Sequence, residues 1–342
     1  MSEAGLYVTG IALSQFVIGA ETLGIGGKSI IATIGLGDAQ LVPSARVPEP
    51  QYEMALLQLI LASNNDSFGV AIGQQLMPPL YGVLTSLAFS SPTLGEALKN
   101  MAQYQAIASG NCGNIEYQVT DSSARFCISM SHRNPVVRRH VAECVLTAFS
   151  NLLRLMSGRQ DFSPSEIWLE HEPFSKSTQR NMEVANGCPV HWGKGSNLLV
   201  LDQRIHDYPI HGHGDEMLRS ATQLAQQQLE ALNQRSSVLD SIKWHANQLM
   251  DSGTPRREIV AERLGISTRT LDRRLKAADL TWQEMLTGLR AQRAIDYLTE
   301  NKLSIADIAE KLGYTDSRAF QRGFKTWTGM TPSEYRTEIL GG

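Results

Sequence analysis

Two groups of basic side chains near the end of this 342-residue chain have types and spacing that suit a polyanion. Each group has arginine at positions i and i+4 and lysine at i+7, and the residues are Arg269, Arg273 and Lys276, then Arg318, Arg322 and Lys325. Residues at this spacing lie on one face of an α-helix. Arginine pairs with two acceptors on a guanine edge, whereas lysine binds backbone phosphate. The two stripes therefore predict two helices that contact DNA.

Polar side chains beside the two triads extend the predicted DNA-binding set. Gln321 carries the amide that suits an adenine edge, and Ser317 lies next to the second triad. Asp272, beside the first triad, differs because a carboxylate repels phosphate. It accepts a hydrogen bond from a cytosine amino group or simply faces solvent, and the sequence leaves both readings open.

Each triad follows a copy of one short pattern. The copies are Ala261-Glu262-Arg263-Leu264-Gly265 and Ala309-Glu310-Lys311-Leu312-Gly313, which lie 48 residues apart. The leucine belongs to the apolar face of a helix, and the glycine permits the positive φ of a tight turn. A second helix that begins just after such a turn completes a helix-turn-helix unit, so we expect two of these units.

Capping residues and apolar spacing predict the ends and inner faces of these helices. We expect the first unit to begin at Thr254-Pro255, because a hydroxyl cap followed by proline suits a helix start. The recognition helices should be capped by Ser267 and by Thr315 or Asp316. Apolar residues four apart should face the core of each unit, and they are Leu271 and Leu275, then Phe320 and Phe324.

A single helix is expected between the two units, from Trp282 to about Glu300. Nineteen residues at about 1.5 Å each give a length of about 28 Å. Successive major grooves on one side of a duplex lie about 34 Å apart. One chain could therefore present both recognition helices to consecutive groove turns.

The stretch from about Ser237 to Arg336 resembles the DNA-binding domain of AraC/XylS-type bacterial transcription regulators. Its most specific matches are Ile305-Ala306-Asp307-Ile308-Ala309, Leu312-Gly313-Tyr314, Ala319-Phe320, Arg322, Phe324-Lys325, Trp327-Thr328-Gly329 and Thr331-Pro332-Ser333-Glu334-Tyr335-Arg336. The resemblance implies an all-α domain of seven helices, whose two recognition helices enter adjacent major grooves. We expect this domain to span residues 237–338.

Length and charge both indicate a further domain before this one. The chain exceeds what one hydrophobic core normally serves. The net charge is +3 from residue 252 onward and −6 before it. Because an acidic surface disfavours DNA, the N-terminal part should have another role.

The N-terminal region, residues 5–214, shows the mixed periodicity of an α+β domain. Helices are expected at about 11–23, 50–62, 66–76, 93–107 and 136–157, and strands at 115–120, 125–131, 165–170 and 197–201. The region resembles the N-terminal "arabinose-binding" domain of a subgroup of these regulators that includes ornithine-utilisation and VirS-like proteins. Its landmarks are Leu23-Gly24, Phe68-Gly69, Ser91-Pro92-Thr93-Leu94, Arg154-Leu155, Gly158, His171, Pro173, Pro189-Val190 and Trp192. The resemblance implies a sensor but does not identify its ligand.

Four aromatic or imidazole residues of this region are candidates for lining a ligand pocket. Rings with a few polar handles are typical of small-molecule sites. The candidates are Trp168, His171, Phe174 and Trp192. The alternative is that they belong to the hydrophobic core.

Residues 215–236 have an apolar stripe at helical spacing. The stripe comprises Met217, Leu218, Ala221, Leu224, Ala225, Leu229 and Leu232. A homodimer formed through this helix and a linker that packs on its own domain are equal alternatives.

Neither a metal site, a cofactor nor catalysis is predicted. Gly26-Gly27-Lys28-Ser29 lacks the earlier glycine and the preceding strand of a phosphate-binding loop. His206, Asp207, His211, His213 and Asp215 crowd one segment, but polar residues are expected in a loop at a domain boundary. The four cysteines have no metal-binding spacing. No signal segment or apolar run long enough for a membrane is present, so we expect a cytoplasmic protein.

The sequence thus predicts a transcription regulator that binds promoter DNA. We expect an activator in which a small metabolite controls promoter binding or contact with RNA polymerase. One alternative is a DNA-binding repair enzyme with a reactive cysteine, and another is a ligand-independent architectural DNA-binding protein. The sequence does not specify the effector, the operator, the sign of regulation or the oligomeric state.

Overall fold

The computed structural model describes residues 6–75, 77–120, 122–210, 213–250, 255–278, 280–300, 302–314 and 316–340. Contacts between elements divide the chain into two compact units. The N-terminal unit comprises Tyr7–Ala45 and Ala55–Glu230, and the C-terminal unit comprises Leu6, Arg46–Met54 and the chain from Ala231 onward. Among the described residues, no helix has both the length and the hydropathy needed to cross a membrane.

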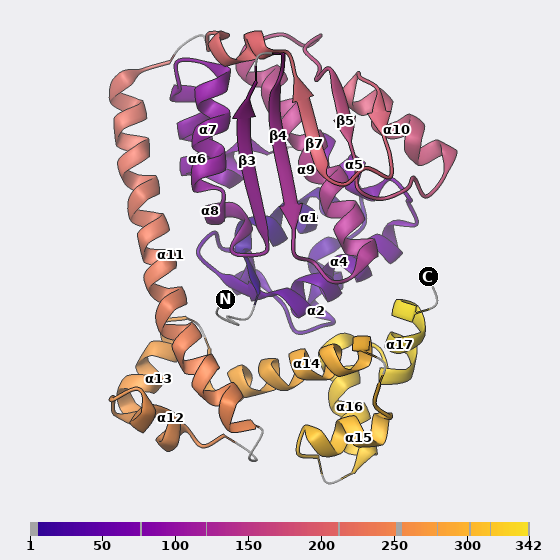
Figure 1. Cartoon of the computed structure of the whole chain (residues 1–342), viewed down its shortest axis with the longest axis vertical. Coiled ribbons are helices and arrows are strands. Elements are labelled where there is room, and N and C mark those ends of the chain that lie inside the picture. The colour runs from indigo at the N-terminus through magenta and orange to yellow at the C-terminus, as the bar shows by residue number, and fades with distance from the viewer. Residues whose placement is uncertain are drawn as a thin grey trace. The chain divides into compact units, whose positions relative to one another are not determined.

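Helices dominate the first part of the chain (Figure 1). They are α1 (Gly10–Thr22), α2 (Gly27–Ala32), α3 (Asp38–Leu41), α4 (Glu49–Ser63), α5 (Phe68–Gln74), α6 (Val83–Ser90), α7 (Leu94–Tyr104), α8 (Ala106–Ser109), α9 (Pro135–Ser157), α10 (Lys176–Asn186) and α11 (Asp215–Met250). Two 3₁₀ turns, η1 (Pro78–Tyr81) and η2 (Gln203–Asp207), and two short strands, β1 (Tyr7–Thr9) and β2 (Arg46–Pro48), complete the set outside the main sheet.

The N-terminal unit contains a five-stranded sheet with the strand order β3-β4-β7-β5-β6. The strands are β3 (Gly113–Val119), β4 (Ala124–Met130), β5 (Glu166–Trp168), β6 (Val190–His191) and β7 (Asn197–Leu201). The pairs β3–β4, β4–β7 and β5–β7 are antiparallel, and β5–β6 is parallel. This mixture of a sheet and helices confirms the predicted α+β class.

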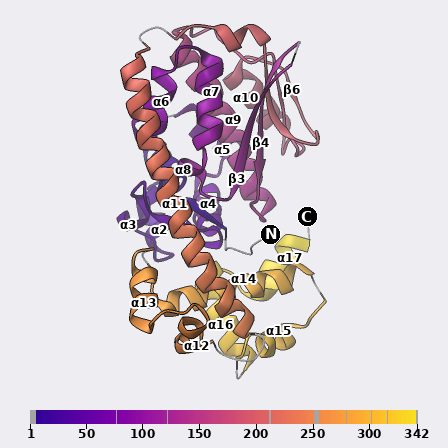
Figure 2. The ribbon, with the colours of Figure 1, turned by 60° about the vertical axis from the view of Figure 1, so that its left-hand side comes forward.

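Only one face of this sheet is covered by helices in the described part of the unit. Helices α5 and α9 lie behind it in Figure 1 and to one side of it in Figure 2. The burial of β4 alternates accordingly, since Phe126 and Ile128 are buried whereas Arg125 and Ser129 are exposed. The other face is therefore exposed where it carries Arg125 and Ser129.

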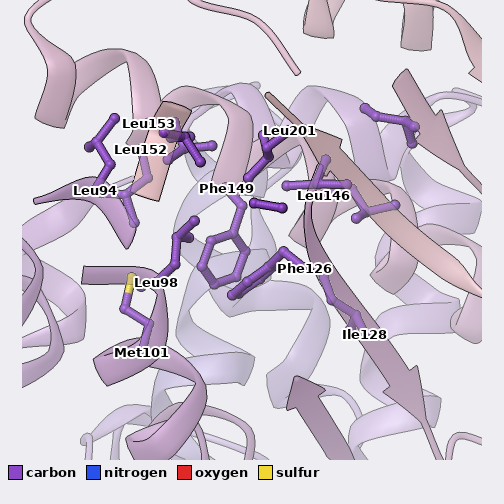
Figure 3. Packing of buried hydrophobic residues seen from close by; sticks show 14 of the residues in the cluster. Leu94, Leu98, Met101, Phe126, Ile128, Leu146, Phe149, Leu152, Leu153 and Leu201 are labelled. Carbon is purple, nitrogen blue, oxygen red and sulfur yellow. The ribbon is translucent and has the colours of Figure 1, made fainter. Parts of the chain in front are cut away.

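The hydrophobic core fills the space between the covered face and the helices. Figure 3 shows side chains of α7, β4, α9 and β7 meeting there. Phe126 and Phe149 lie at its centre, with ring centroids 4.4 Å apart. The full burial of such rings contributes about 2–3 kcal/mol each, so this core is a main source of the unit's stability.

Close approach of α5 to α9 depends on two glycines. A Cβ at Gly69 would lie 2.2 Å from the carbonyl oxygen of His140, and a Cβ at Gly73 would lie 2.5 Å from that of Cys144. Both obstacles are backbone atoms, which cannot move without shifting a whole helix. The landmark Phe68-Gly69 in the sequence therefore has a structural cause.

Most predicted elements of the N-terminal region are confirmed, and the errors are local. Helix α9 and strand β7 match their predicted ranges within one residue. The predicted helix 93–107 is interrupted at Gln105 into α7 and α8. Helix α10 was not predicted, although Ser175 caps its start and Gly187 ends it with a φ of 71°.

Every regular element that the structure describes from Ala231 onward is a helix. The end of α11 is followed by α12 (Arg257–Arg263), α13 (Thr268–Lys276), α14 (Trp282–Glu300), α15 (Ile305–Lys311), α16 (Ser317–Thr328) and α17 (Pro332–Leu340). One apolar cluster joins α11, α12, α13 and the first half of α14, and a second joins the rest of α14 to α15, α16 and α17. The predicted all-α domain with two helical units is thus confirmed.

Candidate functional site

The first helix-turn-helix unit is formed by α12 and α13. Gly265 makes the turn between them with a φ of 65°. The Ser267 hydroxyl accepts a hydrogen bond from the backbone N–H of Thr270 at 3.1 Å, which confirms the predicted cap of α13. Substitution of such a cap by alanine typically costs about 1 kcal/mol.

The predicted start of this unit at Thr254-Pro255 is wrong where it can be checked. Thr254 lies outside the described residues, and α12 begins at Arg257. Arg256 has an extended backbone, with φ −99° and ψ 131°, so Pro255 stands before the helix rather than in its first turn. Pro255 is buried there, so its role is in packing ahead of the helix.

The second unit is formed by α15 and α16. Ser304 and Asp307 cap α15 reciprocally, each side chain accepting from the other's backbone N–H at 3.1 Å. Hydrogen bonds from the Ser304 hydroxyl and backbone lower the pKa of Asp307. Gly313 makes the turn with a φ of 78°, and Asp316 caps α16 by accepting from the Ala319 N–H at 2.7 Å. Of the two predicted caps, Asp316 is confirmed, and Thr315 lies outside the described residues.

Each recognition helix has one buried and one exposed face. The four apolar residues predicted to face the core are buried, and they are Leu271, Leu275, Phe320 and Phe324. The six cations of the two triads are all exposed, and they are Arg269, Arg273, Lys276, Arg318, Arg322 and Lys325. The basic stripes therefore lie opposite the residues that fix each helix to its core.

The basic triads of the two exposed faces match in register, whereas other positions differ. Arg273 corresponds to Arg322, and one position before each arginine stand Asp272 and Gln321. Both of these polar residues are half-buried, as is Ser317 at the start of α16. The recognition faces therefore share three matching cations. Where the first has the carboxylate of Asp272, the second has the amide of Gln321, and Arg274 of the first corresponds to Gly323 of the second.

Asp272 has a cationic neighbour on α12. Its Oδ2 lies 3.5 Å from Nη1 of Arg257, whose Nε lies 3.1 Å from Oε1 of Glu258. The Arg257 and Asp272 side chains are each close to half exposed, so this pair contributes at most about 1 kcal/mol. Its consequence is electrostatic, because Arg257 offsets part of the negative charge of the Asp272 carboxylate.

Helix α14 connects the two units. Its bounds, Trp282–Glu300, confirm the predicted connecting helix. Met285 and Leu286 belong to the apolar cluster of the first unit, and Ile295 and Leu298 belong to that of the second. The helix is therefore built into both units.

The four candidate ligand residues of the N-terminal unit occupy different surroundings. His171 and Trp192 meet edge to face, with ring centroids 5.4 Å apart. Phe174 is 62% exposed and lies under the guanidinium of Arg139, 4.7 Å from it. Trp168 stands on the open face of the sheet. The structure therefore brings together only His171 and Trp192 of this set.

His171 also contacts a buried carboxylate. Its Nε2 lies 3.3 Å from Oε1 of Glu143, and Nδ1 of the buried His140 lies 3.6 Å from Oε2 of the same residue. Burial by itself raises the pKa of a carboxyl group, but the interactions with the neighbouring His140 and His171 outweigh it and lower the pKa of Glu143. This network joins α9 to the loop that follows β5.

Glu143→Gln is expected to destabilise the N-terminal unit by about 3–5 kcal/mol at pH 7, the usual cost of breaking a buried pair. Because the folded pKa of Glu143 is lowered, its stabilisation is present above the unfolded pKa near 4.5 and is lost as the pH falls through the folded value. Urea unfolding at pH 7 and pH 4 measures the difference, which should shrink in acid. Glu96→Gln, at an exposed site, is the control. Equal stability of Glu143→Gln and wild type at pH 7 would contradict the role.

An open depression of about 620 Å³ lies on the outer face of the sheet. Trp168 is the one predicted ligand residue that lines it, beside Arg125, Val200 and Glu166 from three neighbouring strands. Arg125 and Glu166 were not predicted, because only the pairing of β4 and β5 with β7 brings them together. The one signal in the sequence was that both residues lie in predicted strands.

Three of the four cysteines do not have the surroundings of a reactive thiol. Burial raises the pKa of Cys144, and it raises the pKa of Cys188 to about 12. Burial and the charge of Glu116 raise the pKa of Cys127. Because the thiolate is the nucleophile, these shifts disfavour the repair-enzyme alternative.

The histidine-rich segment before α11 is only partly described. His206 stacks on Tyr117, with ring centroids 6.3 Å apart. His211 lies outside the described residues. The contact of His206 with Tyr117 shows a packing role for this ring.

Two family models match the chain. Residues 24–210 match the arabinose-binding domain of AraC transcription regulators, N-terminal, and residues 260–338 match a helix-turn-helix domain. The first match covers the N-terminal unit's sheet and most of its helices, and the second covers α13 to α16.

Curated relatives are similar over most of their length. The ornithine utilization regulator of Pseudomonas aeruginosa is 26% identical over 328 residues, which cover 90% of this chain and 93% of the relative. The HTH-type transcriptional regulator VirS of Mycobacterium tuberculosis is 32% identical over 271 residues, which cover 79% and 78%. Among solved structures, the transcriptional regulator CdpR of P. aeruginosa is 22% identical, with a TM-score of 0.45 over 83% of this chain and 91% of that one.

Proposed function

The chain belongs to the AraC family of DNA-binding transcription regulators, and we propose that it activates promoters in response to a small molecule bound by its N-terminal domain. The relatives are named as transcription regulators, and the family is not one of enzymes. The observation that carries the proposal is the pair of exposed basic faces on two capped helices of matching register.

The proposed DNA contacts follow from the chemistry of each exposed face. Arginines near the middle of a recognition helix suit guanine edges, and the lysines near its end suit phosphates. The proposed set is Arg269, Asp272, Arg273, Lys276, Ser317, Arg318, Gln321, Arg322 and Lys325. Asp272 accepts from a cytosine amino group in this proposal, while Gln321 takes adenine at the corresponding place.

The proposed division of labour follows the sequence-based boundaries. Residues 5–214 sense the effector, and residues 237–338 bind DNA. The proposed linker, 215–236, is the first part of α11, which runs without interruption from Asp215 to Met250. An effector that favours one arrangement of the domains shifts their population by its differential affinity, and so controls promoter binding or contact with RNA polymerase.

Helix α11 supports both alternatives for its apolar stripe. Ala221 and Ala225 are buried, in keeping with packing on its own unit. Met217 and Leu224, seven residues apart, are 60% and 47% exposed, a spacing that suits a second copy of the helix. We propose that the alanine face packs within the chain and that the exposed face contributes to a homodimer.

A genome-wide map of binding sites in the host cell tests the regulator proposal. A few sharp sites upstream of genes are expected for the wild-type chain, and they should disappear when Arg273 and Arg322 are both replaced by alanine. Transcription of the adjacent genes should fall in a deletion strain if the protein is an activator. Diffuse occupancy that the double variant retains would favour an architectural DNA-binding protein instead.

A further inference from the structure

The depression on the outer face of the sheet has the size of a small-molecule site. Its volume of about 620 Å³ falls in the usual range of about 300–1,000 Å³. Strands β4, β7 and β5 form its floor, and the turn before β4, with Ser122 and Ser123, forms part of its rim. It lies wholly within the N-terminal unit, which is the ligand-binding domain of this family.

Two opposite charges flank the centre of the floor. Arg125 pairs in register with Val200 across β4 and β7, and Glu166 pairs with the same Val200 across β5 and β7. Residues directly opposite on antiparallel strands point to the same face, and adjacent strands lie about 4.8 Å apart. The Cα atoms of Arg125 and Glu166 are thus about 10 Å apart, and both long side chains rise on either side of Val200.

Arg125 and Glu166 each have hydrogen-bonding groups that remain available to a ligand. Among the described residues, the Arg125 side chain makes no hydrogen bond or ion pair. Glu166 holds Nε2 of His191 at 2.7 Å through Oε2, which leaves its other oxygen as an acceptor. In this described part of the sheet, Arg125 and Glu166 do not form an ion pair with each other. Neither charge therefore neutralises the other.

The other charged residues of the rim neutralise each other. Nη2 of Arg204 lies 2.6 Å from Oδ2 of Asp202. The Asp202 carboxylate also accepts a hydrogen bond from the backbone N–H of Arg204 at 2.9 Å. The side-chain and backbone bonds from Arg204 lower the pKa of Asp202 to about 2. Apart from this closed pair, Arg125 and Glu166 are the charged residues that line the depression.

Apolar surface lies beside the two charges. Val200 stands between them, and the half-buried indole of Trp168 forms one wall, with the Lys194 ammonium 5.9 Å from the ring centroid. The Trp168 indole N–H is buried and has no hydrogen-bond partner among the described residues. A bound molecule with an aliphatic part would cover Val200 and the ring.

We propose that this depression is the effector site and that it takes a small zwitterion of the α-amino-acid class, a proposal that rests on the proposed sensor function. The guanidinium of Arg125 binds the carboxylate, and the free oxygen of Glu166 binds the ammonium group. Val200 and Trp168 contact the side chain of the ligand. A purely anionic ligand would face Glu166, and a purely cationic one would face Arg125, so the balanced pair selects a molecule that carries both charges.

Isothermal titration calorimetry of the full-length protein with the coded L-α-amino acids tests the proposal. At least one amino acid should bind, and its N-acetyl and amide derivatives, which each lack one charge, should bind at least tenfold more weakly. Arg125→Gln and Glu166→Gln should each weaken binding of the intact amino acid at least tenfold, since each removes a charge-assisted hydrogen bond. Arg180→Gln, an exposed arginine on α10, is the matched control and should bind as the wild type does.

Two results would overturn the inference. One is that no amino acid binds, and the other is that both charge variants bind the amino acid as the wild type does. Thermal unfolding of the unliganded variants shows whether they fold. Both side chains are partly or fully exposed, so the substitutions should leave the fold intact. If promoter sites persist in the genome-wide map while no amino acid binds, the effector inference fails and the regulator proposal stands.

Discussion

Replacing Arg273 and Arg322 together by alanine is expected to weaken operator binding by about 2–6 kcal/mol, because each well-placed arginine is worth about 1–3 kcal/mol. The affinity should fall roughly thirtyfold to about twenty-thousandfold. Both side chains are exposed and lie opposite the buried residues of their helices, so the fold should persist. Fluorescence anisotropy with a promoter fragment from the genome-wide map, at one fixed salt concentration, measures the change.

The matched control for this experiment is Arg274→Ala. Arg274 is exposed and follows Arg273 directly on the same helix. Because consecutive helix residues point about 100° apart, its side chain lies outside the basic stripe, on the side away from Asp272. Its loss should change the affinity by less than about threefold, the scale of one phosphate contact at most. If the double variant keeps the wild-type melting temperature and the wild-type affinity, the assignment of the DNA-binding faces is wrong.

Gly69→Ala is expected to destabilise the N-terminal unit by about 2–4 kcal/mol. The new Cβ would stand 2.2 Å from the carbonyl oxygen of His140, so α5 and α9 must separate and lose contacts along their length. Urea unfolding of the full chain, followed by circular dichroism, measures the loss.

Gly195→Ala is the control for this substitution. Gly195 lies in the same unit, and a Cβ there meets nothing within 4 Å. The expected change is within about 0.5 kcal/mol of wild type. If Gly69→Ala unfolds at the same urea concentration as Gly195→Ala, the close approach of α5 and α9 does not limit stability.

The two helix-turn-helix units could be predicted from the sequence because their signals are local. Leucine or phenylalanine four residues apart, a glycine at the turn and a capping Ser or Asp all lie within about twenty residues of one another. Local signals also compete, as Pro255 shows. A proline after a hydroxyl residue is typical of a helix start, yet the extended backbone of Arg256 delays α12 to Arg257.

The N-terminal unit was harder to predict because its contacts join distant parts of the chain. Strand β6 has two residues, Val190 and His191, and exists only through its pairing with β5. Helix α10 has a mostly polar sequence, so its apolar spacing is weak, although Ser175 and Gly187 mark its ends. Its buried Met182 becomes meaningful only when α9 lies beside it.

The effector region illustrates the same limit. Trp168 was a candidate from its type alone, but Arg125 and Glu166 carry no local pattern that pairs them. They become neighbours because β4 and β5 both pair with β7 and share Val200 as a partner. Register between strands more than thirty residues apart is set by tertiary packing, which a single sequence does not display.

The central claim is that one chain reads two consecutive major grooves through α13 and α16. Methylation-interference footprinting at the strongest promoter site tests it most directly, because it reports guanine N7 contacts. Two sets of guanines about one helical turn apart on one face of the duplex are predicted. Arg273→Ala should remove contacts in one set only, and Arg322→Ala in the other only. A single set of contacts, or the loss of the same guanines in both variants, would contradict the claim.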